Sequence, residues 1–446
     1  MTSNTSFWVL GFILIGIVFI SGCIQQGSSQ IGQDDNQEQL SNKINNGLGD
    51  LCSGEEECIS FCQNNNGICE AYCQGKENEL CLIIFPSEGP IIPEQTNRRT
   101  EENCEGTKIK FDFAPVNLDK TKVLLPLGLM IDSHVTPVDH HYFQNFDNKE
   151  YDIEIYSPGK GIITDIGRFP GTEEGKDYRM VIQHTCTISS IFIYVSNLPE
   201  RIKAHLPEDT SRSGFNIPVE AGELIGYYKD NLDYNLVDEE VVLSGFVVPE
   251  HYNEPWKIHV PNTYDYFNEP IKSKLIEKSI RTAEPISGKI DYDIDGKLVG
   301  NWFLEGTNGY AGAVTEPGQD GYWLGHLSIA YDYLDPTRIV FSIGGYDGEN
   351  SKQFGVDRNS PNPADIGVED GLVEYELVEY DYLTQNGDSW DRRSLAKVSK
   401  TKSYENVLGV VLVQMISDRK IKFEAFPGKT ASQVSSFTEN AKIYER

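Results

Sequence analysis

Val219-Glu-Ala-Gly-Glu-Leu-Ile-Gly-Tyr-Tyr228 is the stretch that decides the fold of this chain. Its polar part, Glu220-Ala221-Gly222, is typical of a turn. The apolar residues that follow predict a β-strand that crosses a glycine at Gly226. The segment therefore predicts one short β-turn-β unit.

Strand-like alternation continues on both sides of this unit. Apolar and polar residues alternate with a period of two in four segments before it: 108–113, 151–156, 161–166 and 180–184. A third block, from about residue 285 to 446, has six further strand-like segments separated by turn residues: 300–306, 327–331, 339–343, 373–377, 407–415 and 420–424. No long segment has the 3.6-residue apolar period of an amphipathic helix. The sequence predicts a mainly β protein, with residues 285–446 forming an antiparallel β-barrel or sandwich.

The order of the earlier segments resembles the LytM/M23 family of zinc metallopeptidases over roughly residues 108–268. Residues 219–228 are similar to the family's phrase V-x-A-G-x-x-I-G-Y, which precedes its last metal-binding strand. Residues 155–163 resemble its V-x-A-P-x-D-G-x-V strand pair, with Lys160 where an acid is common, and residues 180–184 resemble its V-x-I-x-H strand. The resemblance implies a β-sandwich of the duplicated-hybrid-motif type over residues 104–275.

The same resemblance implies a zinc site. Residues 133–142 take the place of the family's H-x-x-x-D motif, and residues 256–260 take the place of its H-x-H motif. A catalytic zinc needs three protein ligands and an open position for water. The implied ligands are His134 or His140, with Asp139 and His259, and the implied catalytic group beside them is His184.

Three departures weigh against catalysis. His134 and Asp139 are one residue further apart than in the family motif. The first position of H-x-H is Lys257, a cation that would repel a neighbouring metal. Residues 193–198, in the place of the family's Y-x-H-L strand, contain no histidine. These departures favour a domain that binds rather than cuts, and a divergent zinc metallopeptidase is the alternative.

The N-terminus predicts export and membrane attachment. Residues 7–20 are a continuous apolar run of the length of a signal-peptide core. They lead into Ile20-Ser21-Gly22-Cys23, which resembles a lipobox and implies lipidation at Cys23 after removal of residues 1–23. Residues 1–6 lack Lys and Arg, so an uncleaved anchor helix is the alternative. Both predict an extracytoplasmic protein attached to the cell membrane, with residues 24–50 as a flexible linker.

Cysteine usage agrees with an exported chain. Of nine cysteines, eight remain without Cys23, and an even set in an exported protein predicts disulfides. Residues 51–82 resemble an α-hairpinin, a disulfide-linked helical hairpin, which implies the pairs Cys58–Cys73 and Cys62–Cys69, with Cys52–Cys81 closing the base. A four-thiolate zinc site is the rival interpretation. Residues 83–103 are a second linker, and Cys104 and Cys186 are the pair that remains.

Charge and minor motifs narrow the function further. A net charge of −30 excludes nucleic acid as a partner, because phosphate binding needs basic surface. The expected partners are membrane lipid through Cys23 and an envelope glycan, peptide or protein. Residues 291–296 open like an EF-hand, but Trp302 stands at the twelfth position, so a strand with an Asp-Gly turn is predicted there.

The remaining aromatic and histidine positions are mostly structural. Residues 300–302 resemble the G-x-W of lipocalins, and Trp302 is predicted to be a core residue. An apolar ligand inside the C-terminal barrel is therefore a third hypothesis. His205 and His251 are predicted to lie at the surface, and His326 is predicted to start a strand.

Overall fold

A computed structural model describes residues 108–169, 177–206, 213–252, 254–312, 321–348 and 350–446. All of them belong to one compact unit, residues 89–446. The predicted signal peptide, Cys23, both linkers and the cysteine-rich hairpin lie outside the described residues, as do Cys52, Cys58, Cys62, Cys69, Cys73, Cys81 and Cys104. No helix in the described ranges has both the length and the apolar character needed to cross a membrane.

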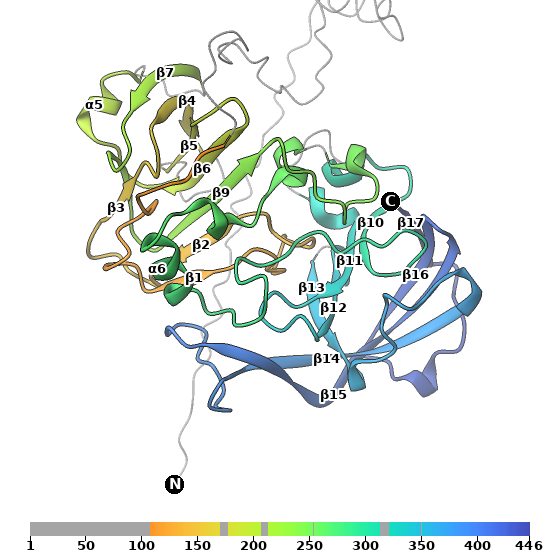
Figure 1. The fold of residues 1–446 in the computed structure, drawn as a ribbon. Coiled ribbons are helices and arrows are strands. Elements are labelled where there is room, and N and C mark those ends of the chain that lie inside the picture. Colours follow the sequence, from red (N-terminus) through yellow and green to blue (C-terminus); the bar gives the residue numbers. More distant parts are fainter. Residues whose placement is uncertain (1–107, 170–176, 207–212, 253, 313–320, 349) are drawn as a thin grey trace, which may run out of the picture. The chain divides into compact units, whose positions relative to one another are not determined.

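The first part of the unit is a seven-stranded antiparallel sheet with the strand order β1-β2-β9-β6-β5-β4-β7 (Figure 1). Its strands are β1 (Val123–Leu125), β2 (His141–Gln144), β4 (Gly161–Arg168), β5 (Tyr178–Gln183), β6 (Ile188–Val195), β7 (Ser213–Val219) and β9 (Asn231–Asp238). A separate two-stranded sheet pairs β3 (Ile153–Tyr156) with β8 (Leu224–Tyr228). Two α-helices, α5 (Glu200–Lys203) and α6 (Ile271–Lys278), accompany these sheets.

The deciding stretch forms the predicted β-turn-β unit, but its two strands join different sheets. Strand β7 pairs with β4 in the seven-stranded sheet, whereas β8 pairs with β3. Gly222 makes the turn with a φ of +76°, which glycine adopts without strain. A side chain at Gly226 would lie 2.7 Å from a methyl group of Val195, so the strand can cross there only as glycine. The unit therefore links the two sheets over a shared core.

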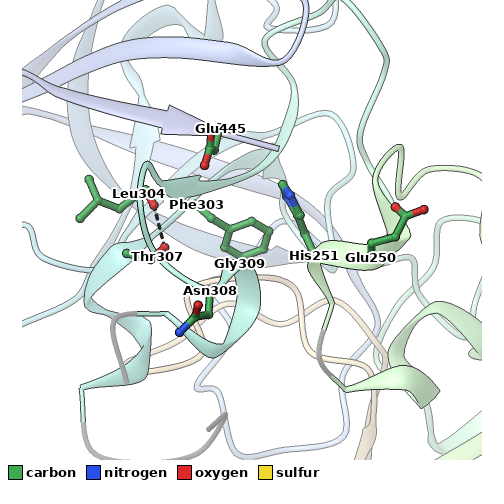
Figure 2. A pocket seen from close by; sticks show the side chains of 8 residues that line it. All are labelled: Glu250, His251, Phe303, Leu304, Thr307, Asn308, Gly309 and Glu445. Atoms are coloured by element: carbon green, nitrogen blue, oxygen red, sulfur yellow. Dashed lines mark hydrogen bonds between the residues drawn. The ribbon is translucent and has the colours of Figure 1, made fainter. Parts of the chain in front are cut away.

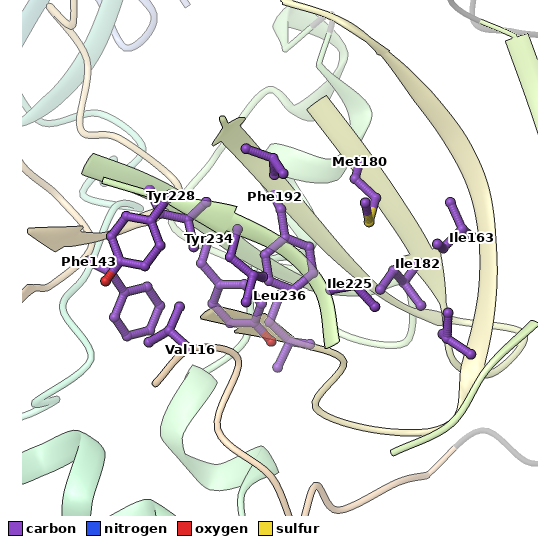
Figure 3. Close-up of a cluster of buried hydrophobic side chains, with 14 of the residues drawn as sticks. Val116, Phe143, Ile163, Met180, Ile182, Phe192, Ile225, Tyr228, Tyr234 and Leu236 are labelled. Atoms are coloured by element: carbon purple, nitrogen blue, oxygen red, sulfur yellow. The ribbon is translucent and has the colours of Figure 1, made fainter. Parts of the chain in front are cut away.

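That core lies between the two sheets and is apolar. Figure 3 shows Ile163, Met180, Ile182 and Phe192 from the large sheet close to Ile225 of β8. Fully burying each such side chain contributes about 1.5–3 kcal/mol. The alternation of strand residues puts these side chains on one face and leaves the opposite face of the large sheet for polar groups.

The second part is a closed eight-stranded antiparallel barrel, as the sequence predicted. Its strands follow one another in chain order from β10 to β17, and β17 pairs back with β10. The strands are β10 (Gly300–Leu304), β11 (His326–Tyr331), β12 (Ile339–Ile343), β13 (Lys352–Val356), β14 (Leu372–Thr384), β15 (Val398–Ser417), β16 (Lys420–Pro427) and β17 (Lys442–Glu445). The protein is thus mainly β.

Apolar side chains fill the barrel, and one cation closes it. Trp302 is fully buried, and its indole N–H donates to the carbonyl of Leu298 at 2.9 Å. The guanidinium of Arg446 lies 4.0 Å from the centre of the Trp302 ring and donates to the carbonyls of Val299 and Ile294. The predicted core role of Trp302 is therefore confirmed.

The long β14–β15 hairpin attaches the barrel to the sheet part. It extends beyond the barrel in Figure 1. At its far end, Lys397 donates to the carbonyls of Ile276, Glu277 and Ser279, where helix α6 ends. Val398 and Trp390 also share a hydrophobic cluster with Leu125 of β1. The two β parts are packed together as one unit.

Three local predictions were wrong. Residues 108–113 alternate like a strand, but only Phe111 makes a bridge, with Phe267, because its neighbours have no partner strand. No strand precedes the turn at Gly296, because Asp291 and Asp293 instead accept backbone N–H bonds from Gly245, Val247 and Asn301. Residues 256–260 do not form a strand: Pro255–His259 is a 3₁₀ helix, with the proline in its first turn.

Candidate functional site

The predicted metal-binding residues converge on the polar face of the large sheet, where β2 begins. The register pairs Tyr142 of β2 with Asp233 of β9 and His141 with Tyr234. Because successive side chains alternate between faces, His141 and Tyr234 lie in the apolar core, whereas Asp233 faces the polar side together with Tyr142. His140, one residue before β2, joins this polar side with its ring edge on Tyr142.

His140 is held between two carboxylates. Its Nδ1 lies 3.2 Å from Asp139 Oδ1, and its Nε2 lies 3.5 Å from Asp233 Oδ2. Burial by itself would lower the pKa of His140, but the charge of Asp233 and the hydrogen bond to Asp139 outweigh it, so the pKa is raised. His140 is therefore an imidazolium paired with acids, which is not the neutral form that binds a metal.

Lys257 supplies the second buried cation of this cluster. It is only 1% exposed, its Nζ donates to the carbonyl of Pro137 at 3.0 Å, and it lies 4.9 Å from the centre of the Tyr310 ring. Burial would raise the pKa of Asp139, but the charge of Lys257 and the contacts with His140 outweigh it and lower that pKa. The ammonium group thus acts on Asp139 as a bound metal would act on a carboxylate ligand.

A third carboxylate and two tyrosines complete the surroundings. Loss of hydration and the nearby Asp139 raise the pKa of the partly buried Glu254 to about 7, although Lys257 opposes the shift. Loss of hydration also raises the pKa of Asp233 to about 6. Tyr310 and Tyr322 come from the β10–β11 connection of the barrel, and their rings contact each other edge to face. The barrel therefore covers the polar face of the sheet with aromatic side chains.

His134 and His259 differ in their relation to this cluster. The ring of His134 lies 5.8 Å from that of His140, and burial with the charges of His140 and Lys257 lowers its pKa to about 4. His259 lies at the end of the 3₁₀ helix, and its Nδ1 donates to the carbonyl of Val241 at 2.6 Å. Residues two apart in a helix with three residues per turn point in different directions, so Lys257 and His259 cannot act as the two positions of an H-x-H strand.

These residues do not fit a zinc ion as they stand. Among the described residues, no group of three or more His, Cys, Asp and Glu side chains is arranged to hold a metal ion. The atoms that would face a metal also include an unpartnered oxygen, Asp139 Oδ2, and an unpartnered nitrogen, His140 Nε2. The cluster is a buried arrangement of acids and protonated bases.

His184, the implied catalytic group, is built into the sheet. Its Nδ1 lies 3.1 Å from the carbonyl of Lys160, and its Nε2 lies 2.9 Å from the hydroxyl of Ser190. A carbonyl only accepts, so Nδ1 carries the proton and Nε2 accepts from Ser190. Burial lowers the pKa of His184 to about 4. Both ring nitrogens are thus used by neighbours within the fold.

The other predicted residues have simpler places. Cys186 forms a disulfide whose partner is outside the described residues, so its pairing with Cys104 stays a prediction. His205 is exposed, and β11 begins at His326, as predicted. His251, predicted at the surface, is partly buried, and its Nδ1 is buried without a hydrogen-bond partner.

His251 lines a pocket of about 250 Å³ at the edge of the barrel (Figure 2). The pocket is formed by three segments: the 3₁₀ helix Pro249–His251, the end of β10 with the residues after it, and β17. Its lining residues are Glu250, His251, Phe303, Leu304, Thr307, Asn308, Gly309 and Glu445. It lies apart from the residues that the sequence singled out.

Sequence reasoning missed Asp233, Glu254 and Tyr310, which surround the predicted ligands. Asp233 lies in a strand that was not predicted, and no local pattern shows that β9 is the neighbour of β2. Tyr310 comes from the other β part of the chain. The adjacent Glu254-Pro255 was a usable signal, because proline favours the first turn of a helix.

Comparison with known proteins gives little. No family model and no curated protein matches the chain. Two solved structures of Helicobacter pylori Csd3, from hexagonal and orthorhombic crystals, are similar to part of it, at 14% and 13% identity and a TM-score of 0.21 each. Each match covers 30% of this chain and 32% of the Csd3 chain, so about a third of Csd3 is involved. A likeness of this extent says nothing about what this chain does.

Proposed function

We propose that the protein is a lipid-anchored, extracytoplasmic binding protein whose M23-like domain, residues 104–275, does not cut peptides. Its ligand would be a glycan, peptide or protein of the cell envelope or its surroundings. The anchor rests on sequence alone, on the apolar residues 7–20 and the lipobox-like residues that end at Cys23.

The buried ammonium of Lys257 is the observation that supports a domain without catalytic zinc. It stands among His134, Asp139 and His140, three of the four predicted ligands, and already supplies positive charge there. A doubly charged ion about 5 Å from it would be repelled by roughly 7 kcal/mol at an effective dielectric constant near 20. Removal of that penalty would require Lys257 to lose its proton or to move.

The alternative is a divergent zinc metallopeptidase of the M23 type. One observation favours it: His134 is neutral at pH 7 and Asp139 is ionised, which are the forms that ligate zinc. This alternative requires His140 to give up its proton and His259 to leave the Val241 carbonyl.

Metal analysis of the full-length, detergent-purified protein separates the two functions. We expect much less than one zinc per chain in the wild type, unchanged by His259→Ala. His205→Ala, at an exposed histidine, is the matched control. About one zinc per wild-type chain, lost in His259→Ala and kept in His205→Ala, would overturn the proposal, and peptide cleavage should then be assayed.

A further inference from the structure

The pocket at the edge of the barrel has a fixed frame. Gly309 has a φ of +59°, and a side chain there would lie 2.5 Å from the carbonyl oxygen of His251. The β10–β11 connection and the 3₁₀ helix Pro249–His251 therefore meet backbone to backbone. The ring of His251 meets that of Phe303 edge to face, with ring centres 6.2 Å apart. These contacts join the segments that form the pocket without filling it.

The polar groups that line the pocket are mostly acceptors. Glu250 and Glu445 are carboxylates, which only accept. The hydroxyl of Thr307 donates its proton to the carbonyl of Leu304 at 2.6 Å, so it offers only lone pairs to a ligand (Figure 2). His251 Nδ1 is buried and has no partner. A molecule that fits this lining must bring hydrogen-bond donors.

The charge of the pocket points the same way. Glu445 lies 3.7 Å from the ammonium of Lys420, whose shorter contact is with Glu305. Within the part of the chain that the structure describes, the carboxylate of Glu250 makes no ion pair or hydrogen bond. The chain as a whole carries a net charge of −30, which attracts cations to its surface.

A metal ion is a poor match for these groups, whereas an organic cation suits them. No three His, Cys, Asp or Glu side chains of the described residues are arranged to hold a metal. A water molecule takes about 30 Å³ of liquid, so a pocket of about 250 Å³ has room for a molecule of sugar-ring size. An ammonium group has three donors and no acceptor, the complement of this lining.

We propose that this pocket binds a small organic molecule through a protonated primary amine, held between Glu250 and Glu445. The inference names a ligand for the proposed binding function. It shares no residue with the Lys257 cluster, so the zinc measurement and the amine measurement can fail separately. Amino sugars and linear amines of the lysine side-chain type share this chemistry.

Calorimetric titration of the full-length protein tests the proposal with four probes. Glucosamine and cadaverine carry a protonated amine, one on a ring and one on a linear chain. Glucose and N-acetylglucosamine have the same ring without the positive charge. We expect the amines to bind at least about tenfold more tightly than the neutral sugars, and the stronger of the two amines identifies the source.

Single variants locate the binding. Glu250→Gln and Glu445→Gln should each weaken amine binding by about tenfold or more, because each removes one charged acceptor. Glu379→Gln, at an exposed glutamate of β14, removes the same charge elsewhere and should leave binding unchanged. Circular dichroism checks that each variant is folded. Equal binding of neutral and charged sugars, no amine binding at millimolar concentration, or amine binding unaffected by both pocket variants would each overturn the proposal.

Discussion

The two β parts of this protein bury opposite kinds of surface. The barrel is filled by apolar side chains around Trp302, and its one buried cation, Arg446, closes the end. The large sheet is apolar on one face, but its other face buries Asp139, His140 and Lys257. Buried charges cost several kilocalories per mole each unless they are paired, and apolar side chains of the same size often stabilise as well or better. The barrel therefore has the composition of a scaffold, whereas the sheet carries groups that stability alone does not require.

The largest effect is expected in the barrel, from Trp302→Ala. Removal of a fully buried tryptophan leaves a cavity and should cost about 3–5 kcal/mol of unfolding free energy. Denaturant unfolding measures this cost. Trp323→Ala, at a partly exposed tryptophan in the β10–β11 connection, is the control and should cost less. An equal loss in both variants would contradict a barrel held together by its packed interior.

An intermediate effect is expected in the charged cluster, from Lys257→Met. Methionine keeps the length of the side chain but leaves Asp139 without the charge that keeps it ionised, which should cost about 2–3 kcal/mol. Adding Asp139→Asn should recover part of the loss, since it removes the unpaired charge. Purely additive losses in a double-mutant cycle would show that the two residues do not interact.

The smallest effect concerns pH and isolates Glu254. Its pKa is raised to about 7, so the fold favours its protonated form. The stability associated with that proton is fully present below the usual pKa near 4.5 and is lost as the pH rises through about 7. Glu254→Gln should match the wild type near pH 5 and exceed its melting temperature near pH 8. A constant difference between the two proteins across this range would refute the assignment.

The sequence predicted regular strands better than the charged site, for a physical reason. Alternation at residues 339–343 and the turn at Gly222 are local, and local patterns suffice to define a strand or a turn. The Trp256–Val260 stretch also alternates, but Pro255 favours a helical turn, and this turn sends Lys257 and His259 in different directions. The pairing of Asp233 with Tyr142, which brings an acid to His140, depends on strand order, which no local pattern encodes.

Strand β17 has a consequence for how the chain folds. It pairs with both β16 and β10, so the barrel acquires its last partner only when residues 442–446 are in place. Until then β10 and β16 are open edges, which are prone to pair with other chains. Joining the first and last strands also closes a long loop, and contacts of this kind form late and slowly. Closure by β17 and Arg446 is therefore expected to be a late, rate-limiting event, during which the unfinished barrel is most vulnerable to aggregation.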